Sequence, residues 1–243
     1  MKLLLFDLDG TILHARHTPG RVPFDLAMRD TFDVTVELAR MRPDGKTDPM
    51  IAAELLALAG AAETAIDAAM LARLERALAT RLAEAIACGA TRVEPMPGVR
   101  AVLETVADDP RFASAVLTGN LVGAAELKLQ AAGLAQFFAV GAFGSDSALR
   151  AALPDVARRR LRDHAGHDVT RRDCVIIGDT PLDHAAAVAN DMPAVLIATG
   201  RTPFAELAAL APAAVFPDWS DRAAIAAALV ALGDGDGGSG RIA

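Results

Sequence analysis

The distribution of apolar and polar residues divides the chain into a helical stretch and a larger region of alternating strands and helices. Residues 3–6 form an unbroken apolar run that ends at Asp7 and Asp9. Such a run is typical of a strand buried on both faces, as in a parallel sheet. Residues 24–89 show helical patterns only, and short apolar runs return after residue 98.

After residue 98, each apolar run is followed by a helical pattern. The expected strands cover residues 113–117, 138–143, 174–177, 194–197 and 214–216. The expected helices cover residues 99–107, 121–132, 147–164, 185–190, 206–210 and 221–232. This alternation predicts an α/β fold, a doubly wound, Rossmann-like parallel sheet with helices on both faces.

The helical stretch between the first strand and the rest predicts an inserted domain. Its expected helices cover residues 26–38, 49–59 and 63–87, between a loop at 13–20 and a Pro-Gly break at 95–98. We place a core domain at 1–14 and 97–232, a helical cap domain at 15–96, and a disordered tail at 233–243. A simple helical bundle would explain the pattern, but an insertion that leaves from a strand end bearing carboxylates favours a lid.

Composition and charge narrow the function classes. At 243 residues, 53% hydrophobic and 23% charged, the chain is expected to be globular, with one or two domains. A net charge of -7 argues against a nucleic-acid surface. No run approaches the ~20 apolar residues of a membrane span, and Asp7 ends the first run too early for a signal peptide. Cys88 and Cys174 are far apart, which indicates neither a disulfide framework nor a zinc site. We therefore expect a cytoplasmic protein, and no oligomeric state is indicated.

Polar residues follow four of the expected strands. They are Asp7 and Asp9; Thr118, Gly119 and Asn120; Asp179, Thr180 and Asp183; and Thr199 and Gly200. The carboxyl ends of parallel strands share one edge of the sheet, where α/β proteins bind ligands. Two neighbouring carboxylates repel each other unless a cation or proton joins them, and an all-oxygen site suits Mg²⁺. A polar residue at the end of one strand is common. The occurrence of polar residues at four strand ends together is what indicates a site.

These motifs resemble those of the haloacid dehalogenase superfamily, on its phosphatase side. The resemblance lies in the order and spacing of Asp7-Leu8-Asp9-Gly10-Thr11, Leu117-Thr118-Gly119-Asn120 and Gly178-Asp179-Thr180-Pro181-Leu182-Asp183. It covers about residues 1–232, and the helical insert is similar to the cap of that family. The resemblance implies an Mg²⁺-dependent phosphatase that hydrolyses a small phosphate monoester through an aspartyl-phosphate.

The resemblance also implies roles for single residues. Asp7 would be the nucleophile and Asp9 the general acid and base. The metal ligands would be Asp7, the backbone carbonyl of Asp9, and Asp179, while Asp183 would act through a water or by orienting Lys128. The phosphate would be held by Thr118, Gly119, Asn120 and Lys128.

The third motif of the family supplies a cation, and the sequence leaves two candidates. The lysines are Lys2, Lys46 and Lys128. Lys128, on the helix expected after Thr118, is our first choice. Arg150 is the alternative, because many relatives carry the lysine in that later region.

Substrate recognition is expected to lie in the cap. The loop at 42–48 carries Arg42 and Lys46, which suit a substrate with a second anionic group, such as phosphoglycolate. A solvated charged loop explains the same residues nearly as well. His14, Arg16 and His17 either reach the site or solvate the linker, and we favour the linker.

Several other activities share parts of this pattern. Relatives that act as dehalogenases lack the second aspartate and need no Mg²⁺, so Asp9 argues against that reaction. A sugar phosphomutase of the beta-phosphoglucomutase type shares every core motif and stays open. A receiver domain is about half this length and lacks the insert. An inactive, partner-binding relative is disfavoured because every catalytic position is filled.

Overall fold

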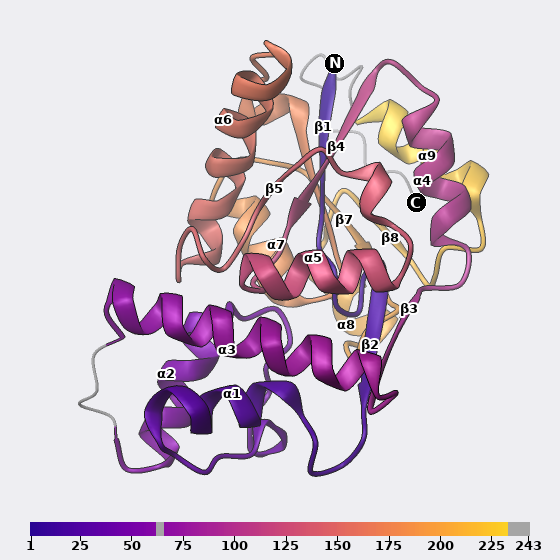
Figure 1. Ribbon diagram of the computed structural model, residues 1–243. Helices are drawn as coiled ribbons and strands as arrows, with labels where there is room; N and C mark the ends of the chain where they lie inside the picture. Colours follow the sequence, from indigo (N-terminus) through magenta and orange to yellow (C-terminus); the bar gives the residue numbers. More distant parts are fainter. Residues whose placement is uncertain (62–65, 233–243) are drawn as a thin grey trace.

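A parallel sheet forms the centre of the larger domain in the computed structural model, which describes residues 1–61 and 66–232. Within these residues the sheet has six strands in the order β5-β4-β1-β6-β7-β8, all paired in parallel. The strands are β1 (Lys2–Phe6), β4 (Phe112–Leu117), β5 (Val140–Ala142), β6 (Cys174–Gly178), β7 (Ala194–Ile197) and β8 (Ala214–Phe216). The predicted α/β fold is confirmed, and β1 is an inner strand (Figure 1).

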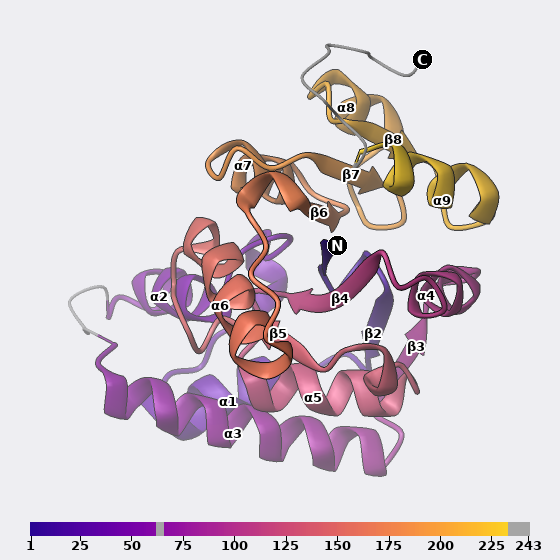
Figure 2. The same cartoon turned by 90° about the horizontal axis from the view of Figure 1, so that it is seen from above.

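Helices cover both faces of this sheet (Figure 2). One face carries α4 (Val99–Ala107), α5 (Val122–Ala131) and α9 (Arg222–Ala231), and the other carries α6 (Leu153–Ala165), α7 (Pro181–Val188) and α8 (Phe204–Ala209). Successive side chains of a strand point to opposite faces. Leu4 and Phe6 of β1 therefore join one hydrophobic cluster, and Leu3 and Leu5 join the other. All four are completely buried, which explains the unbroken apolar run.

The inserted domain lies beyond the carboxyl end of β1 (Figure 1). It consists of α1 (Pro23–Phe32), a short 3₁₀ turn η1 (Leu38–Arg40), α2 (Asp48–Leu58) and α3 (Ala68–Ala87). These helices share a hydrophobic cluster of their own, which Leu121 and Ala124 of the core also join. The cap therefore packs directly on the N-terminal part of α5.

A two-stranded ribbon connects the domains, where the sequence predicted a loop. β2 (Leu13–His17) pairs antiparallel with β3 (Thr91–Pro95). The loop prediction for residues 13–20 is therefore wrong over β2. Both connections lie in this one ribbon, and the domain boundaries expected at 14/15 and 96/97 fall within β2 and just after β3.

Some elements are shorter than the sequence predicted. The helix expected at 26–38 ends at Phe32, because Asp33 adopts a left-handed conformation (φ 56°) and residues 34–36 are β-branched. The strand expected at 138–143 spans only β5. The helix expected at 147–164 begins at Leu153, where Pro154 suits a first helical turn. Residues 63–65 of the third expected cap helix and the tail at 233–243 lie outside the described residues.

No described helix has the length and apolar character needed to cross a bilayer. Neither Cys88, which is exposed, nor Cys174, which is buried, forms a disulfide bond within the part of the chain that the structure describes.

Candidate active site

Three buried aspartates meet where β1 and β6 end. Asp7, Asp179 and Asp183 each offer a carboxylate oxygen within 4.8 Å of the others. Asp7 follows β1, Asp179 follows β6, and Asp183 lies in the first turn of α7. Thus the parallel topology brings together carboxylates that are far apart in the sequence.

Short hydrogen bonds hold two of these carboxylates in place. Thr11 Oγ1 donates to Asp179 Oδ1 at 2.7 Å. Asp183 forms a capping box with Thr180, whose backbone N–H and hydroxyl donate to Asp183 Oδ2 at 3.0 and 2.7 Å. Gly10 has φ of 89°, and a Cβ there would lie 2.5 Å from Asp179 Oδ2. The turn after Asp9 therefore requires glycine.

Arg150 lies between the nucleophile candidate and α7. Its Nη2 pairs with Asp7 Oδ1 at 2.9 Å and also with Asp183 Oδ1. The side chain is buried, and within the described structure its Nε–H has no hydrogen-bond partner. One guanidinium cannot neutralise three carboxylates. Burial, followed by repulsion from Asp183 and Asp7, raises the pKa of Asp179 to about 8.

The donor set of this cluster fits Mg²⁺. Burial also raises the pKa of Asp7 to about 6, although Arg150 opposes the effect. Three carboxylates beside one guanidinium leave two negative charges when all are ionised, which a divalent cation balances. Hard oxygen donors of this kind are the ligands that Mg²⁺ prefers. Asp7, Asp179 and Asp183 could therefore hold it.

Asp9 belongs to a second, separate polar group. Its Oδ2 accepts hydrogen bonds from Lys128 Nζ at 2.6 Å and from Asn120 Nδ2 at 2.9 Å. Asn120 also donates to Thr118 Oγ1 at 3.1 Å and accepts from Lys128. The expectation that Asp183 orients Lys128 is wrong, because Asp183 contacts Arg150 and Thr180 while Asp9 and Asn120 hold Lys128.

The cap closes directly over this group. The backbone N–H of Asp48 donates to the Gly119 carbonyl at 2.7 Å, and Asp48 Oδ2 accepts from the Leu121 N–H at 2.8 Å. Thr47 Oγ1 donates to the Ala148 carbonyl at 2.8 Å. A Cβ on Gly119 would lie 2.2 Å from the Lys46 carbonyl oxygen, so glycine permits this approach.

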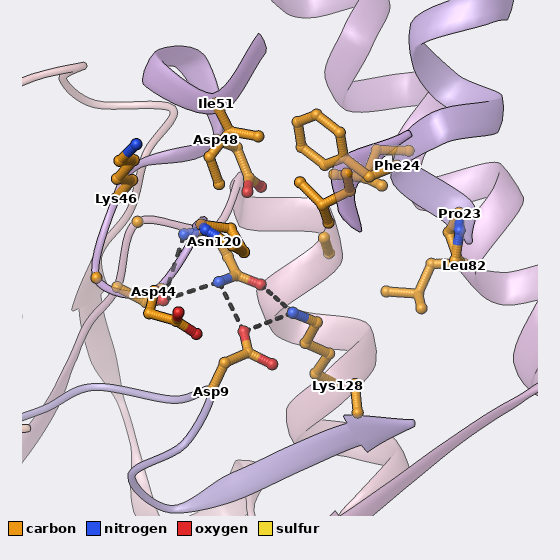
Figure 3. A pocket seen from close by; sticks show the side chains of 18 of the residues that line it. Asp9, Pro23, Phe24, Asp44, Lys46, Asp48, Ile51, Leu82, Asn120 and Lys128 are labelled. Carbon is orange, nitrogen blue, oxygen red and sulfur yellow. Dashed lines mark hydrogen bonds and ion pairs between the residues drawn. The ribbon is translucent and has the colours of Figure 1, made fainter. Parts of the chain in front are cut away.

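Between the cap and the strand ends lies a cavity of about 250 Å³ (Figure 3). Most of the predicted site residues line it: Asp7, Asp9, Lys46, Thr118, Gly119, Asn120, Lys128 and Arg150. Arg42 is exposed and lies outside the lining, whereas Lys46 lines the cavity with its Nζ 2.6 Å from Glu54 Oε2. A substrate-selecting role for Arg42 and Lys46 stays a prediction.

Asp48 and His17 also line the cavity, and neither was favoured as a site residue from the sequence. Asp48 comes from the first turn of α2, and burial raises its pKa to about 6 against the opposing effects of Lys128 and the Leu121 N–H. His17 was expected to solvate the linker, but its Nδ1 lies 2.9 Å from Thr91 Oγ1, and burial followed by Lys128 lowers its pKa. Asp48 ends the charged loop at 42–48, which was a signal for it, whereas nothing local distinguished His17 from His14 and Arg16 in the same linker.

Solved structures share this architecture. A protein from Haemophilus somnus predicted to be a phosphoglycolate phosphatase aligns with a TM-score of 0.61 and 21% identity, over 93% of this chain and 98% of its own. A protein from Thermotoga maritima assigned as a beta-phosphoglucomutase aligns with a TM-score of 0.56 and 15% identity, over 93% and 99%. At these identities the likeness concerns the fold.

The sequence itself gives the family. The phosphoglycolate phosphatase of Rhodospirillum rubrum is 33% identical over 232 residues, which cover 90% of this chain and 88% of that protein. The family model described as haloacid dehalogenase-like hydrolase matches residues 4–187, a span that contains Asp7, Asp9, Lys128, Asp179 and Asp183. With its sheet, its inserted cap and its acidic strand ends, the chain belongs to the haloacid dehalogenase-like hydrolases.

Proposed function

We propose that this hydrolase is an Mg²⁺-dependent phosphatase that cleaves a small phosphate monoester through an aspartyl-phosphate on Asp7. The observation that carries the proposal is the buried group of Asp7, Asp179 and Asp183 beside the cavity under the cap, with Asp9 and Lys128 at the same end. The R. rubrum relative, a phosphatase of a small phosphate ester by its name, supports the same reaction class.

The metal would be held by Asp7, the Asp9 carbonyl and Asp179, with Asp183 next to them. When bound, it would offset the repulsion between the Asp7 carboxylate and the phosphate dianion. Arg150 keeps Asp7 in place, because its guanidinium binds both Asp7 and Asp183.

The two aspartates of the first motif, Asp7 and Asp9, have different roles in the reaction. A carboxylate oxygen of Asp7 attacks phosphorus, and the bond between phosphorus and the ester oxygen breaks. Asp9, as the carboxylic acid, gives its proton to the leaving oxygen. Asp9, now a carboxylate, then takes a proton from a water that attacks the phosphorus, which releases inorganic phosphate and restores Asp7.

Four groups are available to the phosphoryl oxygens. Thr118, the Gly119 amide and Asn120 line the cavity beside Asp9, and Lys128 is fixed there by its bonds to Asp9 and Asn120. Preorganised donors of this kind stabilise the charge of a phosphoryl transition state.

A phosphomutase would use the same aspartates, and the cap side of the cavity favours the phosphatase. Sugar hydroxyls buried there need hydrogen-bond partners, and unpaired ones cost free energy. Leu38, Leu78 and Leu82 take up much of that side, and its polar residues Lys46 and Asp48 already bind Glu54 and the Leu121 N–H.

The test is turnover of p-nitrophenyl phosphate with Mg²⁺ by wild type and Asp7→Asn. Loss of the nucleophile is expected to lower kcat by more than about 10⁴-fold, and EDTA is expected to abolish wild-type turnover. Circular dichroism should confirm that the variant is folded. A folded Asp7→Asn protein with wild-type turnover would contradict the mechanism, full activity in EDTA would remove the metal, and a wild type inactive on a panel of phosphate esters would favour an inactive relative.

A further inference from the structure

The walls of the active-site cavity differ in character. The end formed by the core carries Asp7, Asp9, Thr118, Asn120 and Lys128. The cap side is lined by Val22, Phe24, Leu38, Ile51, Leu78 and Leu82. Figure 3 shows Phe24 and Ile51 above the pair of Asp9 and Lys128, with Leu82 to one side of Lys128.

The two cations that line the cavity from the cap and its rim, Lys46 and Arg201, are each already paired with a carboxylate. Lys46 Nζ lies 2.6 Å from Glu54 Oε2. Arg201, on the rim, pairs with Asp44 at 3.7 Å, and its side chain is 76% exposed. Among the described lining residues outside the catalytic end, no cation is therefore left without a carboxylate.

The remaining polar groups disfavour a second anion. His17 has a lowered pKa because of burial and Lys128, so it is neutral at neutral pH. Asp48 is buried, and its carboxylate faces the same cavity while it accepts from the Leu121 N–H. A substrate carboxylate in this half would meet apolar side chains and another carboxylate, and burying an unpaired charge is costly.

From this lining, the geometry points to a substrate whose organic part is a compact apolar group, with the phosphate at the core end and the carbon chain against Phe24, Ile51 and Leu82. The cavity volume of about 250 Å³ indicates that this organic part is small, because pockets for drug-sized ligands have volumes of ~300–1,000 Å³. This inference rests on the proposed phosphatase function and names the substrate class of that site.

Two esters of nearly equal shape test it. Isobutyl phosphate carries two methyl groups where phosphoglycolate carries two carboxylate oxygens, so the pair differs in charge and hardly in size. Wild-type protein with Mg²⁺ is expected to give a kcat/KM at least about 10-fold higher for isobutyl phosphate, the scale of one methylene in an apolar pocket. Equal values, or a preference for phosphoglycolate, would overturn the inference and leave the phosphatase function standing. No turnover of these esters or of p-nitrophenyl phosphate would overturn both.

A variant of the cavity wall tests whether that wall causes the preference for isobutyl phosphate. Leu82→Arg puts a guanidinium into the apolar half and is expected to move the ratio of the two kcat/KM values toward phosphoglycolate by at least about 10-fold. Leu58→Arg is the matched control, because Leu58 is 63% exposed on the cap surface and does not line the cavity. An unchanged ratio in a folded Leu82→Arg protein would contradict the placement. If that variant does not fold, the wild-type comparison decides.

Discussion

The core side and the cap side of the cavity differ in the kind of contact that holds their side chains in place. On the core side, charged groups are paired across long sequence distances, as in the contact between Lys128 and Asp9. On the cap side, apolar residues of α1, α2 and α3 form a wall that is part of the hydrophobic cluster of the cap. Under the proposed function, the phosphoryl chemistry uses the charged surface, and we expect the apolar surface to select among organic groups.

The two cations of the core side also differ from each other. Arg150 is 8% exposed and joins two buried carboxylates. Lys128 pairs with Asp9, whose side chain is 37% exposed. Burial makes the first pair costly to break, while the second can be solvated after a substitution. We therefore expect Arg150 to matter most for stability and Lys128 mainly for turnover.

The largest effect on stability is expected for Arg150→Ala. The change leaves Asp7 and Asp183 buried without their counter-charge, which costs about 3–5 kcal/mol of the free energy of unfolding. Urea unfolding in EDTA measures it. Arg201→Ala is the control, because its pair is exposed and should contribute less than about 1 kcal/mol. Equal losses in the two variants would show that the Arg150 contacts are not stabilising.

Lys128→Ala is expected to act on catalysis. Loss of one preorganised electrostatic contact lowers kcat by about 10²–10³-fold. Its loss of stability should be smaller than that of Arg150→Ala, since Asp9 stays partly hydrated. Kinetics with p-nitrophenyl phosphate and urea unfolding of both variants give the comparison. An unchanged kcat/KM for Lys128→Ala beside an inactive Arg150→Ala would assign the third-motif cation to Arg150.

The sequence predicted the core side well because its signals are local. An unbroken apolar run such as residues 3–6 is typical of a strand inside a parallel sheet. Asp7 then lies at the carboxyl end of that strand, where ligands bind. That Asp7 and Asp179 converge followed from parallel topology, since β1 and β6 are adjacent, whereas their assignment as metal ligands came from the family resemblance. The choice between Lys128 and Arg150 did not follow, because both side chains reach the site across long sequence separations.

The cap side was less predictable for a physical reason. β2 is short and mixes Leu13 with charged and polar residues, and its partner β3 lies far along the chain. Such a ribbon gains its stability from pairing rather than from propensity. Asp48 likewise reads as an ordinary first-turn residue of α2, and only the docking of the cap brings it to Leu121.

Asp48 links the two sides, and its titration tests that link. Burial chiefly raises its pKa from 3.8 to about 6, so the folded chain keeps a proton that the unfolded chain releases in this window. The stability from this group is therefore complete below about pH 4 and is lost as the pH rises through about 6. The free energy of unfolding of wild type relative to Asp48→Asn should fall by about 3 kcal/mol across the window.

Urea unfolding in EDTA at both ends of the window measures this difference. Asp163→Asn is the control for the loss of an exposed carboxylate, since its side chain is 71% exposed. A difference between wild type and Asp48→Asn that does not change with pH would show that Asp48 is not buried against Leu121 in solution, and that the cap is open there.

The smallest effect is expected for Lys46→Ala. The charge of Lys46 is already paired with Glu54, and a partly exposed pair of this kind contributes about 0–1 kcal/mol. The KM values for isobutyl phosphate and phosphoglycolate should therefore both change by less than about 3-fold. Arg42→Ala, at an exposed position outside the cavity lining, is the matched control. If Lys46→Ala instead raised KM for phosphoglycolate alone, by more than about 10-fold, the cationic loop would select the substrate, as the sequence first suggested. In that case Lys46 would leave Glu54 and bind the substrate when the ligand enters. The apolar wall would then exclude water without selecting the substrate.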